Sequence, residues 1–385
     1  MVQYRRVIDL AETALKRSYF LFGPRQTGKT FLLRRIFPEA PFYNLLLADQ
    51  FSRISKNPSL LREELTVKKS NINGPIIIDE IQKLPLLLDE VHNLIETYGF
   101  RFILTGSSAR KLKRGGANLL GGRAWTRHLF PLVSDEIPDF DLRRAINFGT
   151  LPSIYQSEYP EEDLAAYCGS YLKEEIQAEG AVRRIENFSR FLQTAALVNT
   201  ELVNFESVAH DAQVPARTVR EYFSILEDTL VGALLPPFGR TVRRKAVATS
   251  KFYFFDIGVC NHLAGRRSIE PHTELFGKSF EHLIFTELRA WRDYRNDQRP
   301  LSFWRDYSGN EVDFIIGDEV AIEVKSSRMV TGKHVKSLRM FSGAIRPKHS
   351  VVVSMDQAPR LLEGGIEVLP WREFLIRLWS GEYGG

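Results

Sequence analysis

The chain has 385 residues, of which 44% are hydrophobic and 26% are charged. At roughly 150 residues per domain this length predicts two or three domains, and the composition excludes an intrinsically disordered chain. The two cysteines, Cys168 and Cys260, exclude a disulfide scaffold and a four-cysteine zinc site. No apolar run approaches the roughly 18 residues of a membrane span, and the N-terminal segment lacks a signal-peptide core. We therefore expect a cytoplasmic protein with no membrane association.

The first third of the chain alternates short apolar runs with helical patterns. The runs at 19–22, 75–78 and 101–104 suit buried strands, and residues 29–36 and 85–97 have helical spacing. Strands that alternate with helices predict an α/β domain with a parallel sheet covered on both faces. We place three domains at residues 1–150, 151–250 and 251–385.

Residues 23–30 read GPRQTGKT and match the phosphate-loop pattern G-x-x-x-x-G-K-[ST] in full. The pattern follows a predicted strand and opens a predicted helix, so backbone N–H groups and the helix N-terminus can surround phosphate oxygens. Lys29 is expected to reach the β- and γ-phosphates, and the Thr30 hydroxyl to ligate Mg²⁺. The predicted site for ATP and Mg²⁺ consists of Gly23, Pro24, Arg25, Gln26, Thr27, Gly28, Lys29 and Thr30.

The apolar run at 75–78 ends in two acidic residues, Asp79 and Glu80. Asp79 would hold Mg²⁺ through water, and Glu80 would orient and deprotonate the attacking water. A glutamate at this place predicts a hydrolysing enzyme rather than a nucleotide-binding switch.

Two further residues complete the predicted ATPase site. Thr105 follows a third strand, at the end that faces the ligand in a parallel sheet, and could sense the γ-phosphate. Arg123, in LLGGRAW, is a candidate arginine finger supplied to a neighbouring subunit, which would make the protein a homo-oligomer. Arg110, Arg114 and Arg127 compete for that role.

The middle of the chain, from 161 to 228, has helical periodicity. Residues 204–228 have helix-turn-helix spacing, with Pro215 opening the second helix, and the basic segment GRTVRRK follows where a winged helix carries its wing. Such helices meet a DNA groove, and basic wings meet phosphates; a lid or protein–protein module is the alternative. The predicted DNA contacts are Arg217, Arg220, Arg243, Arg244 and Lys245.

After residue 237 the chain becomes strand-rich, as in KFYFFDIGV and LSFWRDY, and a pair of strands, EVDFIIG and VAIEVKSS, carries Asp313, Glu323 and Lys325. Glu323 and Lys325 share a strand face, and the return of the chain brings Asp313 alongside. Upstream, Glu281 lies on or near the inward face of a helix and needs a partner, either a metal or Lys325. Converging carboxylates and a lysine can hold Mg²⁺ for phosphodiester cleavage, with Asp313 and Glu323 as ligands.

The spacing D-x9-E-x-K with a helical glutamate upstream resembles the PD-(D/E)xK nuclease superfamily. The resemblance assigns its acidic and basic roles to Glu281, Asp313, Glu323 and Lys325. The acid-free segment 324–355 contains Lys333 and Lys336 and lies where that family meets the nucleic-acid backbone. An exposed hairpin with a salt bridge, or a nuclease-like fold that binds DNA without cutting it, are the alternatives.

The order of parts resembles a prokaryotic group of AAA-type ATPases with a C-terminal domain of unknown function 4143. The motifs FGPRQTGKT, PIIIDEIQKLP, FILTGSSARKL, LLGGRA, FGTLPSIY, KFYFFDIGV, GKSFEHLIFTEL and IEVKSS carry it. The resemblance implies an ATPase domain, a winged-helix-like middle domain and an α/β nuclease-like C-terminal domain, and it favours Thr105 and Arg123 in their assigned roles.

These observations predict a Mg²⁺-dependent ATP hydrolase that acts on DNA. ATP turnover would drive remodelling of DNA, or its cleavage by the nuclease-like domain; branched DNA as substrate rests on analogy alone. One alternative is an ATP-gated DNA- or protein-binding regulator whose nuclease-like domain is inactive. Another is a protein-remodelling ATPase whose basic clusters are incidental.

Overall fold

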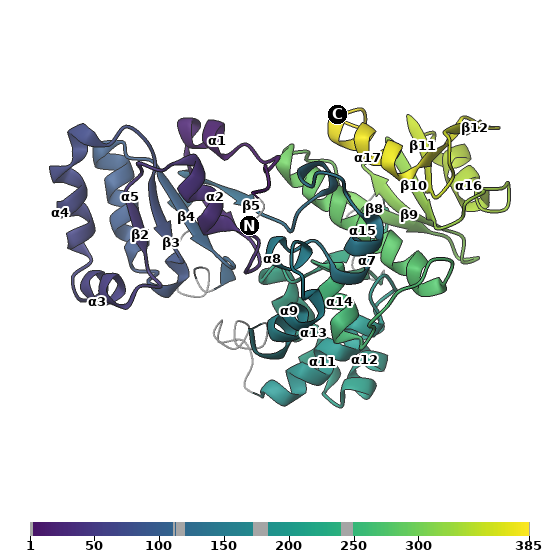
Figure 1. The fold of residues 1–385 in the computed structure, drawn as a ribbon, viewed down its shortest axis with the longest axis horizontal. Helices are drawn as coiled ribbons and strands as arrows, with labels where there is room; N and C mark the ends of the chain where they lie inside the picture. The colour runs from purple at the N-terminus through teal and green to yellow at the C-terminus, as the bar shows by residue number, and fades with distance from the viewer. Residues whose placement is uncertain (1–2, 111, 113–119, 172–183, 240–248, 385) are drawn as a thin grey trace. The chain divides into compact units, whose positions relative to one another are not determined.

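The computed structural model describes residues 3–110, 112, 120–171, 184–239 and 249–384. The chain forms two compact units, one of residues 6–130 with 228–230 and the other of the remaining residues (Figure 1). Both units mix helices with sheets, which confirms the predicted α/β class.

The first unit is built on a five-stranded sheet in the order β2-β3-β4-β1-β5, with all neighbours parallel. The strands are β1 (Ser18–Phe22), β2 (Phe42–Asn44), β3 (Ile76–Asp79), β4 (Phe102–Gly106) and β5 (Ala124–His128). The helices are α1 (Leu10–Lys16), α2 (Lys29–Ile36), α3 (Ala48–Lys56), α4 (Ser59–Val67) and α5 (Leu87–Tyr98). Every residue of β1, β3 and β4 is buried, as a parallel sheet covered on both faces requires. The strands β2 and β5 were not predicted.

The second unit begins with a helical part. Its helices are α7 (Leu142–Phe148), α8 (Pro152–Tyr155), α9 (Pro160–Ala166), α11 (Ile185–Leu197), α12 (Phe205–Ala212), α13 (Ala216–Asp228) and α14 (Ile257–Leu263). The turn between α12 and α13 contains Gln213 in the left-handed conformation, with φ of 53°, so the predicted helix-turn-helix is confirmed. A two-stranded antiparallel sheet, β6 (Gly232–Leu235) and β7 (Lys251–Phe254), packs on these helices, with the Phe252 ring centroid 4.9 Å from that of Phe223.

The expectation that the whole KFYFFDIGV segment is strand is wrong after Phe254, because Asp256 ends the strand and caps α14. Its carboxylate accepts hydrogen bonds from Val259 N at 3.0 Å and Thr150 N at 2.8 Å. A Cβ on Gly149 would lie 2.0 Å from Asp256 Oδ1, so only glycine fits against this cap. Burial raises the pKa of Asp256 to about 6. The Asp256 side chain therefore holds the chain segment around Gly149 against the start of α14.

The same unit ends with a six-stranded mixed sheet in the order β12-β13-β11-β10-β9-β8. The strands are β8 (Leu301–Arg305), β9 (Glu311–Ile316), β10 (Val320–Lys325), β11 (His349–Ser354), β12 (Arg360–Leu362) and β13 (Ile366–Pro370). The helices are α15 (Glu274–Tyr294), α16 (Lys336–Ile345) and α17 (Trp371–Ser380). The predicted pair of strands is confirmed as antiparallel β9 and β10, and α15 packs against β10 (Figure 1).

A buried carboxylate, Glu287, ties α15 to two other segments. It accepts hydrogen bonds from Ser134 N at 2.7 Å and from the indole Nε1 of Trp379 in α17 at 2.7 Å. Burial disfavours the charged form and raises the pKa of Glu287 to about 7.

This raised pKa predicts a pH-dependent stability. A carboxyl group whose pKa rises on folding contributes stability below its unfolded pKa and loses that contribution as pH rises through the folded value. The uncharged Glu287→Gln variant avoids this loss. Between pH 5 and pH 8 we expect the free energy of unfolding of the parent to fall by about 1–3 kcal/mol relative to that of Glu287→Gln.

Denaturant unfolding of parent and variant at both pH values measures this shift. The exposed Glu363→Gln serves as the matched control and should show no such shift. A difference between parent and Glu287→Gln that stays constant with pH would contradict the assignment.

Candidate functional site

The phosphate loop connects β1 to α2, and two of its glycines are required by geometry. Gly28 has φ of 89°, in the left-handed region, and a Cβ on Gly23 would lie 2.2 Å from the Leu129 carbonyl oxygen. The buried Lys29 donates hydrogen bonds to Gly23 O at 2.6 Å and Pro24 O at 3.0 Å. The lysine ammonium therefore lies against the loop that is predicted to surround the phosphates. Arg25 is half-buried and Gln26 exposed in the same loop, and the Thr27 hydroxyl donates to Pro24 O at 2.9 Å.

The carboxyl ends of three parallel strands meet beside this loop. Thr30 Oγ1 donates to Asp79 Oδ2 at 2.9 Å, and Thr105 Oγ1 donates to the other oxygen of Asp79. Glu80 N donates to Thr105 Oγ1 at 3.2 Å. The fully buried Asp79 is thus adjacent to the Thr30 hydroxyl, which fits a Mg²⁺ held by hydroxyl and carboxylate oxygens. The structure brings Lys29, Thr30, Asp79, Glu80 and Thr105 together.

Gln82 is a further residue of this site, and sequence reasoning missed it. Its amide Nε2 donates to Glu80 Oε2 at 2.6 Å, and Glu80 itself is in the left-handed conformation with φ of 63°. Gln82 is confined by Gly106, because a Cβ on that glycine would lie 2.4 Å from Gln82 Oε1. The amide two residues after Glu80 in the DEIQ segment was the available signal.

The four candidate finger arginines have different surroundings. Arg123 pairs with Glu96 of α5 and donates to Gly121 O at 3.3 Å. Arg110 pairs with Asp228, and Arg127 lies in β5 with its guanidinium over the Trp125 ring at 5.5 Å. Arg114 lies outside the described residues.

The predicted DNA contacts of the helical part are exposed. Arg217 extends from the first turn of α13, 3.6 Å from Glu221. Arg220 lies over the Phe205 ring at 4.6 Å, with Glu206 at 3.7 Å. These acidic neighbours reduce the positive potential that α13 presents. Arg243, Arg244 and Lys245 lie outside the described residues.

A carboxylate cluster forms where α15, β7, β9 and β10 meet. Its members are Lys251, Tyr253, Glu281, Glu311, Asp313, Glu323 and Lys325. The Lys251 ammonium lies 3.0 Å from Glu281 Oε1, 2.6 Å from Glu311 Oε1 and 3.8 Å from Asp313 Oδ1. Lys325 lies 2.5 Å from Glu323 Oε1, and Val324 N donates to Asp313 Oδ2 at 2.7 Å. The four predicted residues, Glu281, Asp313, Glu323 and Lys325, thus belong to one cluster.

Of the two partners predicted for Glu281, a metal or Lys325, the second is corrected by this geometry. The Glu281 carboxylate accepts from Lys251 Nζ and from the Tyr253 hydroxyl at 2.6 Å, not from Lys325. Both donors come from β7, whose alternation points Lys251 and Tyr253 to the same side. Sequence reasoning missed them because KFYFF had no visible link to the acidic motif.

The charges of the cluster perturb one another. Burial raises the pKa of Glu323, and the neighbouring Asp313 adds to that effect. Burial opposes the charge on Lys251, but Glu281, Asp313 and Glu311 outweigh it and raise the pKa of Lys251. Lys251 is therefore a charged lysine with 3% exposure.

Part of the cluster fits a metal ion. Glu323 Oε2 is buried and has no hydrogen-bond partner among the residues that the structure describes, and Asp313 lies beside it. No group of three or more His, Cys, Asp or Glu side chains in the described ranges is arranged to hold a metal. Mg²⁺, however, is commonly held by one or two carboxylates, with water and substrate phosphate completing its shell. Asp313 and Glu323 fit that role.

A cavity with basic, acidic and apolar lining residues lies beyond the end of β10, the strand that carries Glu323 and Lys325. The cavity has a volume of about 360 Å³, and Ser326 and Arg328, which follow Lys325, line it together with Arg143, Trp371 and Arg372. The three arginines can pair with phosphates, although Asp141 also lines the cavity and the Trp371 ring is in contact with the Arg372 guanidinium at 4.3 Å.

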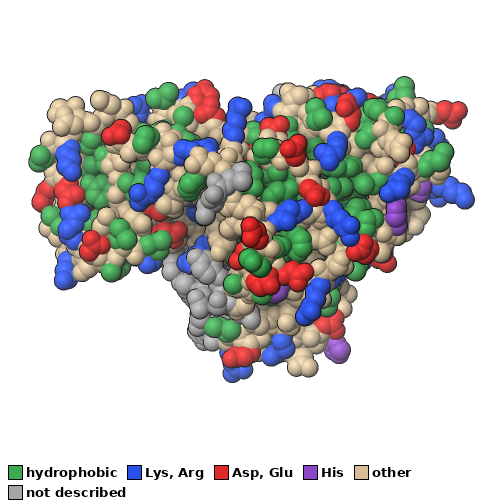
Figure 2. All heavy atoms as spheres, viewed as in Figure 1, with side chains coloured by type: hydrophobic (Ala, Val, Ile, Leu, Met, Phe, Trp, Pro, Cys, Tyr) green, Lys and Arg blue, Asp and Glu red, His purple; other side chains and the backbone are tan. Residues whose placement is uncertain are grey.

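The predicted contacts Lys333 and Lys336 are exposed, before and at the start of α16. Within each unit as drawn in Figure 2, Lys and Arg side chains are interspersed with Asp and Glu side chains.

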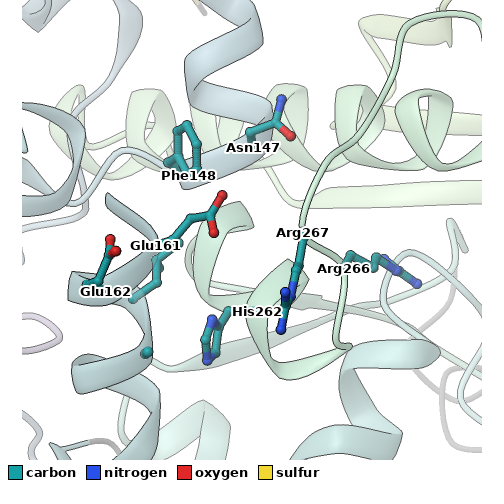
Figure 3. Close-up of a pocket in the computed structure, with 9 residues that line it drawn as sticks. Asn147, Phe148, Glu161, Glu162, His262, Arg266 and Arg267 are labelled. Atoms are coloured by element: carbon teal, nitrogen blue, oxygen red, sulfur yellow. The ribbon is translucent and has the colours of Figure 1, made fainter. Parts of the chain in front are cut away.

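A second cavity, of about 290 Å³, lies in the helical part between α7, α9 and α14. Glu161 and Glu162 lie on one side of it and Arg266 and Arg267 on the other (Figure 3). Burial lowers the pKa of His262 in its wall, against the opposing effect of Glu161. Mixed charge of this kind does not select an anionic ligand.

Three family profiles match successive parts of the chain. An AAA domain matches residues 15–137, and two domains of unknown function, DUF8612 and DUF4143, match residues 139–270 and 276–374. The predicted AAA-type domain and domain of unknown function 4143 are thereby confirmed. The chain carries an AAA-type ATPase domain, which indicates ATP-dependent activity.

Similar proteins cover most of the chain. Uncharacterized proteins of Mycobacterium tuberculosis and Mycobacterium bovis are each 25% identical over 334 residues, which is 83% of this chain and 72% of theirs. An uncharacterized protein of Methanocaldococcus jannaschii is 22% identical over 332 residues, 78% of this chain and 72% of its own.

Two solved structures are more distantly similar. The Aeropyrum pernix ORC1 protein in complex with DNA matches 66% of this chain and 90% of its own at 17% identity, with a TM-score of 0.26. A STAND protein with a tetratricopeptide repeat sensor from Pyrococcus horikoshii matches 73% and 45% at 14% identity, with a TM-score of 0.22. The fold class therefore rests on the sheet order of the chain itself. Within the described ranges, no helix has the length and apolar character needed to span a bilayer.

The contact between Gly106 and Gln82 predicts a specific effect on catalysis. A methyl group in Gly106→Ala would displace the Gln82 amide that holds Glu80. Misplacing a catalytic group by about 1 Å costs up to roughly 10²-fold in rate, so we expect ATP turnover to fall by about 10- to 100-fold while nucleotide affinity stays nearly unchanged.

Steady-state turnover and binding of a fluorescent nucleotide measure the two effects. Gly74→Ala is the matched control, because a Cβ on Gly74 has no heavy atom within 4 Å. Parental turnover in Gly106→Ala would show that Gln82 does not position Glu80.

Proposed function

We propose that the protein is a Mg²⁺-dependent ATP hydrolase that acts on DNA and couples ATP turnover to DNA remodelling or cleavage. The observation that carries the hydrolase part is the meeting of Lys29, Thr30, Asp79, Glu80 and Thr105 at the ends of three parallel strands. Few other chemistries need a phosphate loop, a metal-binding hydroxyl and a carboxylate pair at one place.

Each of these residues has a defined task in the proposal. Lys29 would move from the loop carbonyls to the phosphates, and Thr30 and Asp79 would hold Mg²⁺. Glu80 would deprotonate the attacking water, with Gln82 fixing its carboxylate. Thr105 is hydrogen-bonded to both Asp79 and the Glu80 backbone. A contact between Thr105 and the γ-phosphate would therefore affect the positions of both residues.

The oligomeric part of the proposal depends on Arg123. In its ion pair with Glu96 the Arg123 side chain is 34% exposed and that of Glu96 is 52% exposed, and ion pairs at the surface contribute only about 0–1 kcal/mol. Arg123 can therefore leave Glu96 at little cost and act as a finger on a neighbouring subunit of a homo-oligomer.

The DNA part of the proposal rests on the second unit. Asp313 and Glu323 would hold Mg²⁺, Lys325 would polarise the scissile phosphate, and the arginines that line the cavity beyond β10 would pair with phosphates of the strand. Exposed Arg217, Arg220, Lys333 and Lys336 would add phosphate contacts. Branched DNA is the substrate we would test first. The proposed domains are residues 1–150, 151–250 and 251–385.

One observation favours the alternative, an ATP-gated DNA- or protein-binding regulator with an inactive nuclease-like domain. Lys251 occupies space among the carboxylates that a cation would otherwise use. Cleavage and binding therefore have to be measured separately.

The hydrolase part predicts separable effects of two substitutions. Lys29→Ala should lose ATP binding, since it removes the cation that faces the phosphates. Glu80→Gln should keep ATP binding and lose about 10²–10⁴-fold in turnover, because only the general base is removed. Isothermal titration with ATP and steady-state phosphate release distinguish the two, and turnover at the parental rate in both variants would refute the ATP site.

The DNA part is tested by adding duplex, single-stranded and four-way-junction DNA to the same reactions. We expect DNA to stimulate turnover, and Asp313→Asn to abolish strand cleavage while keeping ATP hydrolysis. Asp318→Asn, in the exposed turn between β9 and β10, is the matched control. DNA-stimulated ATP turnover without strand cleavage in the parent would favour the regulator. ATP turnover that no DNA changes would refute the proposal that the protein acts on DNA.

A further inference from the structure

We infer that Lys251 is a built-in cation of the carboxylate cluster, and that it restricts the cluster to one divalent cation instead of two. This inference deepens the proposed function, on which it rests for the assignment of Asp313 and Glu323 as metal ligands. It concerns the number of metal ions, which can be measured without ATP or DNA.

Strand pairing and packing around β7 hold the backbone of Lys251 in position. In β7 it pairs with Leu235 of β6 on one side and forms a bridge with Leu202 on the other. The next residue, Phe252, is fully buried against Phe223 on the opposite face of the strand. Because both edges and the opposite face of β7 are packed, the Lys251 side chain has little freedom to leave.

The ammonium group of Lys251 occupies one end of the cluster. It contacts Glu281 at 3.0 Å and Glu311 at 2.6 Å, and lies 3.8 Å from Asp313. The Tyr253 hydroxyl adds a hydrogen bond to Glu281 at 2.6 Å. A metal ion at this end would have to displace an ammonium group that is almost completely buried.

The other end of the cluster has an open acceptor. Lys325 contacts Glu323 Oε1 at 2.5 Å, whereas Glu323 Oε2 has no hydrogen-bond partner among the described residues and is buried. A buried carboxylate oxygen without a partner is costly. Asp313 lies between the two ends, so one cation next to Glu323 Oε2 would use the free oxygen and leave Lys251 in place.

The charge of the cluster supports one divalent ion. When the four carboxyl groups are ionised, as metal binding requires, Glu281, Glu311, Asp313 and Glu323 face three cationic groups, Lys251, Lys325 and the more exposed Arg305, which pairs with Glu311 at 3.3 Å. One divalent cation together with one phosphodiester anion would make this set neutral. A second divalent cation would leave two uncompensated positive charges in a site that is largely buried. Two-metal sites place their ions about 3.5–4 Å apart and need carboxylates around both, but Lys251 already holds Glu281 and Glu311.

The experiment counts Mn²⁺ bound by the full chain without nucleotide, by electron paramagnetic resonance and by isothermal titration. The Asp79→Asn background removes the carboxylate proposed to hold Mg²⁺ at the phosphate loop. We expect one Mn²⁺ per chain, lost in Glu323→Gln. In Lys251→Met, which frees Glu281 and Glu311, we expect a second Mn²⁺ or binding at least about tenfold tighter, equivalent to roughly 1.4 kcal/mol. Lys251→Arg keeps the positive charge and should bind one Mn²⁺, as the parent does.

Two Mn²⁺ in the parent, or one with unchanged affinity in Lys251→Met, would overturn the inference, and so would none in the parent. Where Lys251→Met fails to fold, Lys251→Gln, which also removes the positive charge, takes its place. The proposed function is judged separately, because one bound Mn²⁺ without cleavage of any DNA leaves the inference standing and the nuclease proposal refuted. Cleavage of DNA by a parent chain that binds two Mn²⁺ would support the nuclease proposal and overturn the inference.

Discussion

A charged side chain that leaves water must find a partner inside the protein, and both candidate sites are organised by this constraint. Asp79 is fully buried at the end of β3 and is held by Thr30 and Thr105. Lys251, with 3% exposure, is held by Glu281 and Glu311. In both cases the partners come from different strands and helices, so the packing of a sheet fixes the chemistry at its edge.

Sequence spacing predicts the first unit well because its candidate site residues are local. The phosphate loop is contiguous, and Asp79, Glu80 and Thr105 directly follow or end apolar strands, which the buried β3 and β4 confirm. Gln82 escapes prediction for a physical reason. Its role depends on the packing of β4, where Gly106 leaves room for the amide beside Glu80. The strands β2 and β5 escape too, because their residues are only partly buried and lack a continuous apolar run.

The second unit shows where local spacing stops being informative. Antiparallel pairing of β9 and β10 brings Asp313 close to Glu323 and Lys325, as period-two alternation predicts. Lys251 enters the same cluster from a strand that pairs with β6, and no spacing rule connects it to the acidic motif. Residues of the KFYFFDIGV segment also have different structural roles that its apolar pattern does not reveal. Lys251 and Tyr253 contact Glu281, whereas Asp256 caps α14.

The two faces of β7 bring this short strand into contact with both the helical part and the carboxylate cluster of the second unit. Phe252 packs into the aromatic core of the helical part, against Phe223 of α13, while its neighbour Lys251 points to the carboxylate cluster. Consecutive side chains of a strand lie on opposite faces and move with one backbone. The contact of Phe252 with Phe223 fixes this backbone against α13. Because Lys251 is the neighbouring residue, the packing of the helical part helps to hold in place the ammonium group that contacts Glu281 and Glu311.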